Sequence, residues 1–196
     1  MNLQGPQMQR TGFTLIELVV VIAVVMIVTG TSLPRLTELS QSYSAYQEKK
    51  RWLQLFSFAR ASAALENSLV TLCPLQANRC ADDMHQEWAL FTDSNRNKKL
   101  DPDEKILRVL LPKAETRFGY YNLGQPYFRF GDIRGDNTYL GMASGFTLCP
   151  LGELDKTAYH MTINILGRAK LHSRRNDQQQ PMRFSHQRWQ VARCDR

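Results

Sequence analysis

The chain has 196 residues, of which 43% are hydrophobic, and its 25 Lys and Arg against 18 Asp and Glu give a net charge of +7. This composition excludes a wholly disordered chain, and the length allows one modest globular domain beside a membrane-length apolar segment. An enzyme is disfavoured, because the four His residues are scattered and the H-E-x-x-H, G-x-S-x-G and phosphate-binding glycine patterns are absent.

The first element in chain order is an apolar segment, residues 13–33, which contains the carboxylate of Glu17. As a helix it would rise about 1.5 Å per residue and cover about 30 Å, the thickness of a hydrocarbon core, so we expect a transmembrane helix. A charged side chain there costs about 2.5–3.5 kcal/mol and is usually paired. A secretory signal peptide fits poorly, because Arg10 is the only charged side chain before the segment and no small-residue cleavage site follows it.

The helical pattern continues over residues 34–67, and we expect Pro34 to kink the helix rather than end it. Apolar residues recur there at steps of three and four, which predicts an amphipathic half that packs on a globular domain. The pattern ends near Asn67, a residue type that accepts the left-handed conformation after a helix. The predicted stripe consists of Leu36, Leu39, Tyr43, Tyr46, Leu53, Phe56 and Ala63.

Residues 68–196 change to short segments that are β-branched or aromatic and separated by turn residues. Seven such segments favour antiparallel sheets, so the sequence predicts an α+β fold in which a long N-terminal helix packs on a β-sheet domain. The predicted strands lie within residues 68–75, 87–93, 105–112, 116–123, 127–132, 145–151 and 159–171.

The four cysteines, at positions 73, 80, 149 and 194, indicate two disulfides in an exported domain. Three connectivities are possible. The short separation favours Cys73–Cys80, which leaves Cys149–Cys194 to pin the C-terminal end onto a strand. A zinc site is the alternative, but no C-x-x-C spacing supports it.

Residues 93–104, DSNRNKKLDPDE, place oxygen atoms at the spacing of a calcium-binding EF-hand loop. Two features oppose calcium: such a loop needs Gly where this chain has Lys98, and the adjacent Lys98 and Lys99 repel a cation. The alternative is a polar hairpin turn, because Asn and Asp tolerate turn conformations. The candidate ligands are Asp93, Asn95, Asn97, the Lys99 carbonyl, Asp101 and Glu104.

Positive charge is concentrated at the C-terminal end, where residues 167–196 hold eight Lys and Arg and two Asp, or +6 of the total of +7. Phe184 and Trp189 interleave this charge with aromatic surface, as in proteins that contact nucleic-acid phosphates and bases. A solvated basic surface, or a face that meets acidic neighbours, is the alternative. The basic residues expected to contact double-stranded DNA are Arg168, Lys170, Arg174 and Arg175.

The N-terminal stretch GFTLIELVVVIAV resembles the start of type IV pilins and of the pilin-like subunits of type II secretion. The resemblance implies that residues 1–12 are a leader, removed between Gly12 and Phe13 by a prepilin peptidase, and that the new Phe13 amine is methylated. It also gives Glu17 a partner, because the carboxylate can approach the Phe13 ammonium of a neighbouring subunit in a filament. Opposite charges a few ångströms apart offset each other's desolvation, which would favour the assembled state.

The globular half resembles the GspH/FimT family of minor pilins and pseudopilins, through Cys73, Trp88, Phe91, Asp93 and the Gly167–Arg168 pair. GRAKLHSRR also resembles the basic end of DNA-binding members, with Lys170 in place of a second Arg. The resemblance implies a minor type IV pilin that helps initiate pilus assembly and could lie at the pilus tip, in support of motility, adhesion or DNA uptake. The alternatives are a DNA-binding pilin for transformation and a minor pseudopilin of type II secretion.

The resemblance also implies where the chain works and with which partners. Its N-terminus would be cytoplasmic, residues 13–33 would cross the inner membrane once, and the domain of residues 68–196 would be periplasmic before it enters a pilus or pseudopilus. The expected partners are other minor and major pilins, the prepilin peptidase, the inner-membrane assembly platform and double-stranded DNA. No cofactor is expected unless calcium binds the loop of residues 93–104.

Overall fold

The structure is a computed structural model that describes residues 12, 14–121, 126–131, 144–185 and 187–194, with only the backbone described at 31–35. The chain divides into two compact units, Met1–Gln41 and Ser42–Arg196. Helix α1 (Leu15–Glu66) contributes to both and continues through Pro34. It ends where the sequence predicts, because Asn67 adopts the left-handed conformation with a φ of 46°.

In the first unit, the large apolar side chains of α1 from Leu15 to Val28 are 45–80% exposed and lie on every side of the helix. A helix that is apolar all round needs a covering of lipid or of other helices. Among the described residues, no helix combines the length and the apolar character that crossing a membrane requires.

In the second unit, α1 buries a stripe that differs from the predicted one. Tyr43 and Tyr46 are exposed, whereas Glu48 and Trp52 are fully buried. The apolar pattern did not predict this face because the face includes Glu48, which is polar. The Glu48 carboxylate accepts hydrogen bonds from the Trp52 Nε1 (3.2 Å) and from the Arg51 guanidinium (2.8 Å). The buried apolar residues of this stripe are Ala45, Trp52, Leu55, Phe56, Ala59 and Ala63.

Trp52 lies at the centre of the core, between the sheets of the domain. Its ring centroid is 5.1 Å from those of Trp88 and Phe146 and 5.5 Å from that of Phe118. Aromatic pairs in such tilted and edge-to-face arrangements add to the stabilisation from burial. The helix is therefore held on the domain by an aromatic cluster from both large sheets.

The first sheet follows α1 in sequence and is antiparallel throughout, with the order β2–β1–β3–β4 and with β6 paired to β1. Each predicted strand from residue 68 to 132, apart from the segment 116–123, appears in this sheet. Its strands are β1 (Val70–Gln76), β2 (Arg79–Cys80), β3 (Trp88–Thr92), β4 (Ile106–Leu110) and β6 (Phe128–Phe130).

The second sheet has the antiparallel order β5–β7–β8–β9. The predicted segment 159–171 is two strands rather than one, because the chain turns back at Gly167, whose φ is +70°. The strands are β5 (Arg117–Tyr120), β7 (Ser144–Cys149), β8 (Tyr159–Ile163) and β9 (Ala169–His172).

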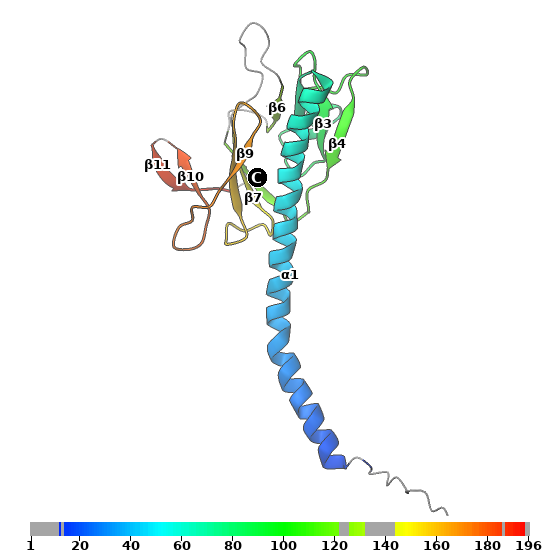
Figure 1. Ribbon diagram of the computed structural model, residues 1–196, viewed down its shortest axis with the longest axis vertical. Coiled ribbons are helices and arrows are strands. Elements are labelled where there is room, and N and C mark those ends of the chain that lie inside the picture. The colour runs from blue at the N-terminus through cyan, green and yellow to red at the C-terminus, as the bar shows by residue number, and fades with distance from the viewer. Residues whose placement is uncertain (1–11, 13, 122–125, 132–143, 186, 195–196) are drawn as a thin grey trace, which may run out of the picture. The chain divides into compact units, whose positions relative to one another are not determined.

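A two-stranded hairpin of β10 (Met182–Ser185) and β11 (Arg188–Val191) follows, and the sequence did not predict it. Figure 1 shows this hairpin at the margin of the domain, away from α1. The disulfides are Cys73–Cys80 and Cys149–Cys194, as predicted, and the second ties the chain after β11 to β7. The α+β fold is thus confirmed.

Candidate functional site

The first candidate site is the start of α1, where Thr14 and Glu17 form a reciprocal cap. The Glu17 carboxylate accepts hydrogen bonds from the Thr14 backbone N–H and hydroxyl, each 3.3 Å long, and the Thr14 Oγ1 accepts one from the Glu17 N–H at 3.3 Å. This is a capping box, which satisfies backbone donors that the first helical turn leaves unpaired. Glu17 therefore has an intramolecular role that sequence reasoning missed, although the T-x-x-E spacing signals it.

Gly12 and Phe13 are the expected cleavage and methylation positions, and Phe13 lies outside the described residues. Among the described residues, a Cβ added to Gly12 would have no neighbour within 4 Å. The fold of the chain therefore places no steric demand for glycine at position 12, and such a demand would have to come from an enzyme that processes this site.

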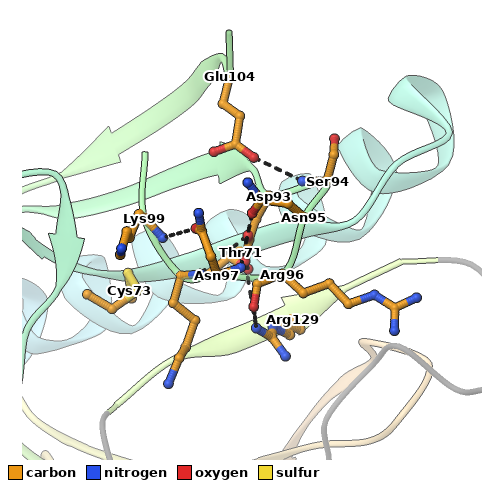
Figure 2. A network of polar contacts seen from close by, with 12 residues as sticks. Thr71, Cys73, Asp93, Ser94, Asn95, Arg96, Asn97, Lys99, Glu104 and Arg129 are labelled. Atoms are coloured by element: carbon orange, nitrogen blue, oxygen red, sulfur yellow. Dashed lines mark hydrogen bonds and ion pairs between the residues drawn. A yellow bond between two sulfur atoms is a disulfide. The ribbon is translucent and has the colours of Figure 1, made fainter. Parts of the chain in front are cut away.

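The second candidate site is the loop of residues 93–104, which connects the antiparallel strands β3 and β4. Asp93 is fully buried and is anchored from outside the loop: the Thr71 hydroxyl donates to its Oδ2 at 2.6 Å, and the Arg129 guanidinium lies 3.8 Å from the same oxygen. Figure 2 shows Thr71, Asp93 and Arg129 grouped at the base of the loop. Lys98 adopts the left-handed conformation that favours glycine, with a φ of 60°.

Asp101 and Glu104 accept hydrogen bonds within the loop. Asp101 Oδ2 accepts from the side-chain amides of Asn95 and Asn97, both at 2.7 Å, and these bonds lower the Asp101 pKa. Glu104 accepts from the backbone N–H groups of Ser94 (3.0 Å) and Asp101 (3.1 Å). Burial raises the Glu104 pKa, and the nearby Asp93 and Asp101 charges also raise it. No group of three or more His, Cys, Asp or Glu in the described part of the chain is arranged to hold a metal.

The third candidate site is the basic C-terminal end, where the four expected DNA contacts differ in their surroundings. Arg168 lies in the turn before β9 and Lys170 within β9, and both side chains are exposed. Arg174 is exposed as well, with its guanidinium carbon 4.7 Å from the centroid of the Trp189 ring. These three residues can reach a ligand.

Arg175 is committed to the fold. It is half-buried, and its guanidinium donates to the backbone carbonyls of Gln179 (2.6 Å), Ala158 (3.0 Å) and Asp155 (3.4 Å). A guanidinium that already donates to three carbonyls has little capacity left for phosphate. Arg175 therefore holds the loop before β10 in place.

A groove between α1 and the turn before β9 brings Arg60 to the same site as Arg168. Both arginines line it, its volume is about 530 Å³, and its remaining walls are small residues. Sequence reasoning missed Arg60, because more than a hundred residues separate it from Arg168 and no local pattern links them. The other lining residues are Ser57, Ala61, Ala64, Gly167 and Ala169.

A helix that is apolar all round at its start, with a carboxylate in its first turn, and that packs its second half on antiparallel sheets defines a pilin-like subunit. The family model of the Type II transport protein GspH matches residues 50–167, more than half of the chain. The chain therefore belongs to the GspH family. The model of the prokaryotic N-terminal methylation motif matches residues 7–33.

Solved structures that resemble this chain include two crystal forms of the type IV minor pilin FimU from Pseudomonas aeruginosa PAO1, each 13% identical. They cover 66% and 69% of this chain and 90% of their own, with TM-scores of 0.44 and 0.45. No curated protein matches the chain. The family is one of pilins and pseudopilins, structural proteins that associate with other pilins, and the methylation motif indicates a membrane-anchored subunit of a pilus or pseudopilus.

Proposed function

We propose that this chain is a minor type IV pilin that helps initiate pilus assembly, and that it has no catalytic activity. The observation that carries the proposal is the exposed apolar surface of α1 from Leu15 to Val28, with Glu17 near its N-terminal end. Exposed apolar surface of this extent marks a contact with membrane or protein. Residues 13–33 would first anchor the subunit in the inner membrane with a single pass and then pack among the helices of other pilins.

Glu17 would act at the moment of assembly. Among the described residues of the isolated chain, the Glu17 carboxylate accepts hydrogen bonds from the Thr14 N–H and hydroxyl. In a filament, the Glu17 carboxylate would instead pair with the positively charged Phe13 ammonium of a neighbouring subunit. Where water is excluded, a full positive charge stabilises a carboxylate more strongly than N–H and O–H dipoles do. The subunit would therefore be more stable in the filament than alone in the membrane.

Deletion of the gene tests this proposal, because an initiating subunit controls how many filaments form. We expect fewer surface pili per cell, restored by the wild-type chain. The related alternative is a minor pseudopilin, which the name of the matching family model favours. If deletion leaves pili unchanged but abolishes secretion of type II substrates, the chain serves that machine and the pilus proposal is wrong.

We also propose a second function, contact with double-stranded DNA, on the strength of the basic groove and the exposed C-terminal charge. Arg60 and Arg168 line one hollow with small walls, which leaves room for a sugar–phosphate strand. Lys170 and Arg174 are exposed further along the chain. Phosphate contacts release counterions, so the affinity would fall with salt, with a logarithmic slope of about −0.9 per contact.

The test uses the processed full-length chain in detergent and a mixed-sequence DNA duplex. Replacing Arg60, Arg168, Lys170 and Arg174 together with Gln should remove most of the affinity and most of the salt slope. Lys156→Gln, which removes an exposed charge from the turn before β8, is the matched control and should change little. Unchanged binding by the quadruple variant would show that the groove and β9 do not contact DNA.

A further inference from the structure

The β10–β11 hairpin presents an aromatic face that is largely exposed. Phe184 and Trp189 are directly opposite each other in the register of the hairpin, with ring centroids 5.4 Å apart. Phe184 is 60% exposed and Trp189 37% exposed, whereas the other two tryptophans of the chain, Trp52 and Trp88, are fully buried. Large aromatic rings left in water on a short hairpin are unusual, because they contribute most when buried.

The opposite face of the hairpin is the one that docks on the domain. Side chains alternate between the faces of a strand, so Arg183 points away from the neighbouring Phe184. The Arg183 guanidinium lies 4.3 Å from the centroid of the Tyr121 ring and donates to the Gln190 side chain at 3.0 Å. The Phe184–Trp189 face is therefore turned outward by the way the hairpin is attached.

The attachment is rigid at the base of the hairpin. The Met182 N–H donates to the Arg174 carbonyl at 2.9 Å, and the Ala192 N–H donates to the Pro181 carbonyl at 2.9 Å. The disulfide of Cys194 follows three residues after β11. The aromatic rings are thus presented on a fixed support, which lowers the entropy that a ligand would have to overcome.

The charge around this face indicates the chemistry of its ligand. Arg174 lies over the Trp189 ring, Arg188 is exposed on β11, and residues 178–194 contain no Asp or Glu. We propose that the hairpin is a stacking platform for the bases of single-stranded DNA, with Phe184 and Trp189 as the stacking rings and Arg174 and Arg188 on the phosphates. Every base has a π-face, so such a platform binds without sequence preference. The proposal rests on the DNA contact proposed above and adds to it a preference for unpaired bases.

The buried positions of Trp52 and Trp88 make Trp189 a specific reporter. We would titrate the processed full-length chain in detergent with oligothymidylate of about 12 nucleotides, within the site size of a single-strand platform. We expect quenching of Trp189 fluorescence and tighter binding of this strand than of a duplex of equal length. Polyglutamate of equal charge, which lacks bases, should neither quench nor compete.

Three variants separate stacking from charge. Phe184→Ala and Trp189→Ala should each weaken single-strand binding about tenfold to a hundredfold with an unchanged salt slope, because base stacking contributes about 1–3 kcal/mol per base. Trp189→Phe should keep most of the affinity and lose the fluorescence signal. Phe58→Ala is the matched control, because Phe58 is also 37% exposed beneath a guanidinium, that of Arg108 at 5.0 Å, and this variant should bind normally.

The outcomes distinguish this inference from the DNA function on which it rests. If duplex binds as tightly as single strand and the hairpin variants bind both normally, the platform is wrong and the basic groove remains the DNA contact. If neither form of DNA binds, both proposals are wrong. If polyglutamate quenches Trp189 as well as DNA does, or if Phe184→Ala impairs only incorporation into pili, the face recognises an acidic surface or a pilin and the platform is overturned.

Discussion

The backbone carbonyl of Arg193 lies so close to Gly119 of β5 that a Cβ on residue 119 would overlap its oxygen. The Tyr121 hydroxyl donates to the same carbonyl at 3.2 Å, and the Arg193 N–H donates to the Tyr121 hydroxyl oxygen. The C-terminal segment can therefore pack closely on β5 because Gly119 has no side chain. Two hydrogen bonds with Tyr121 hold it there, next to the disulfide of Cys194.

Gly119→Ala should displace this segment, because a backbone oxygen cannot swing aside as a side chain can. We expect the free energy of unfolding to fall by about 1–3 kcal/mol, the usual cost of overpacking, as measured by urea denaturation. Gly145→Ala is the comparison, since the nearest atoms to its Cβ belong to side chains rather than to backbone, those of Tyr121 at 3.0 Å and of His160 at 3.3 Å. Equal losses in the two variants would contradict this account of the C-terminal segment.

His160 should make the stability of the domain depend on pH between about 6.5 and 4. Burial, the neighbouring His172 and the Arg183 charge lower its pKa to about 4. Between these values an unfolded chain binds a proton that the folded chain does not, so stability falls as the pH falls. The loss should be on the order of 3 kcal/mol and nearly complete at pH 4.

Denaturation curves of the wild type and of His160→Gln, recorded across this pH range, check the prediction. Glutamine is chosen because it can still form a hydrogen bond with the Thr147 hydroxyl, which lies 2.9 Å from the His160 Nδ1 in the wild type. The variant should show a much flatter profile over that window. The lowered pKa values of Asp83 and Asp101 act at about pH 4 and below, at the end of this window. Within the window, the lowered pKa of His172 adds to the slope and the raised pKa of Glu104 opposes it. A variant with the slope of the wild type would show that another group titrates.

The loop of residues 93–104 should keep its structure without calcium. Its carboxylates already accept hydrogen bonds from Thr71, from two asparagine side chains and from backbone N–H groups. We expect the melting temperature to be the same with millimolar calcium and with a chelator. A calcium site would stabilise the fold by about 2.7 kcal/mol at a hundredfold excess over Kd, and Glu104→Gln would remove that gain. A melting temperature that rises with calcium in the wild type but not in Glu104→Gln would establish a calcium site and contradict the interpretation of this loop as a simple polar turn.

Several features of the fold could be predicted from the sequence, because they depend on residues that are close together in the chain. The helix end at Asn67, most of the strands and the short Cys73–Cys80 disulfide follow from local spacing and turn chemistry. The buried face of α1 was misassigned because Glu48 is polar in the sequence but is paired with Trp52 in the core. The pairing of Phe184 with Trp189 was not predicted, because the sequence pattern indicated no strand after residue 171.

Glu17 has two roles that different substitutions should separate. Glu17→Gln keeps a carbonyl oxygen that can accept from the Thr14 N–H, whereas Glu17→Ala removes the cap as well as the charge. If charge pairing with a neighbouring Phe13 ammonium favours assembly, both variants should be cleaved normally and both should fail to restore pilus number in a deletion strain. If Glu17→Gln restores normal pili, the cap is sufficient and the pairing hypothesis is wrong.

Mass spectrometry of the sheared pilus fraction tests the central claim most directly, because a pilin must be found in the filament in its processed form. We expect the chain there at a small fraction of the abundance of the major pilin, with N-methylated Phe13 as its first residue and both disulfides intact. A chain that is absent from the fraction, or that begins at Met1, would contradict its assignment as a processed minor pilin.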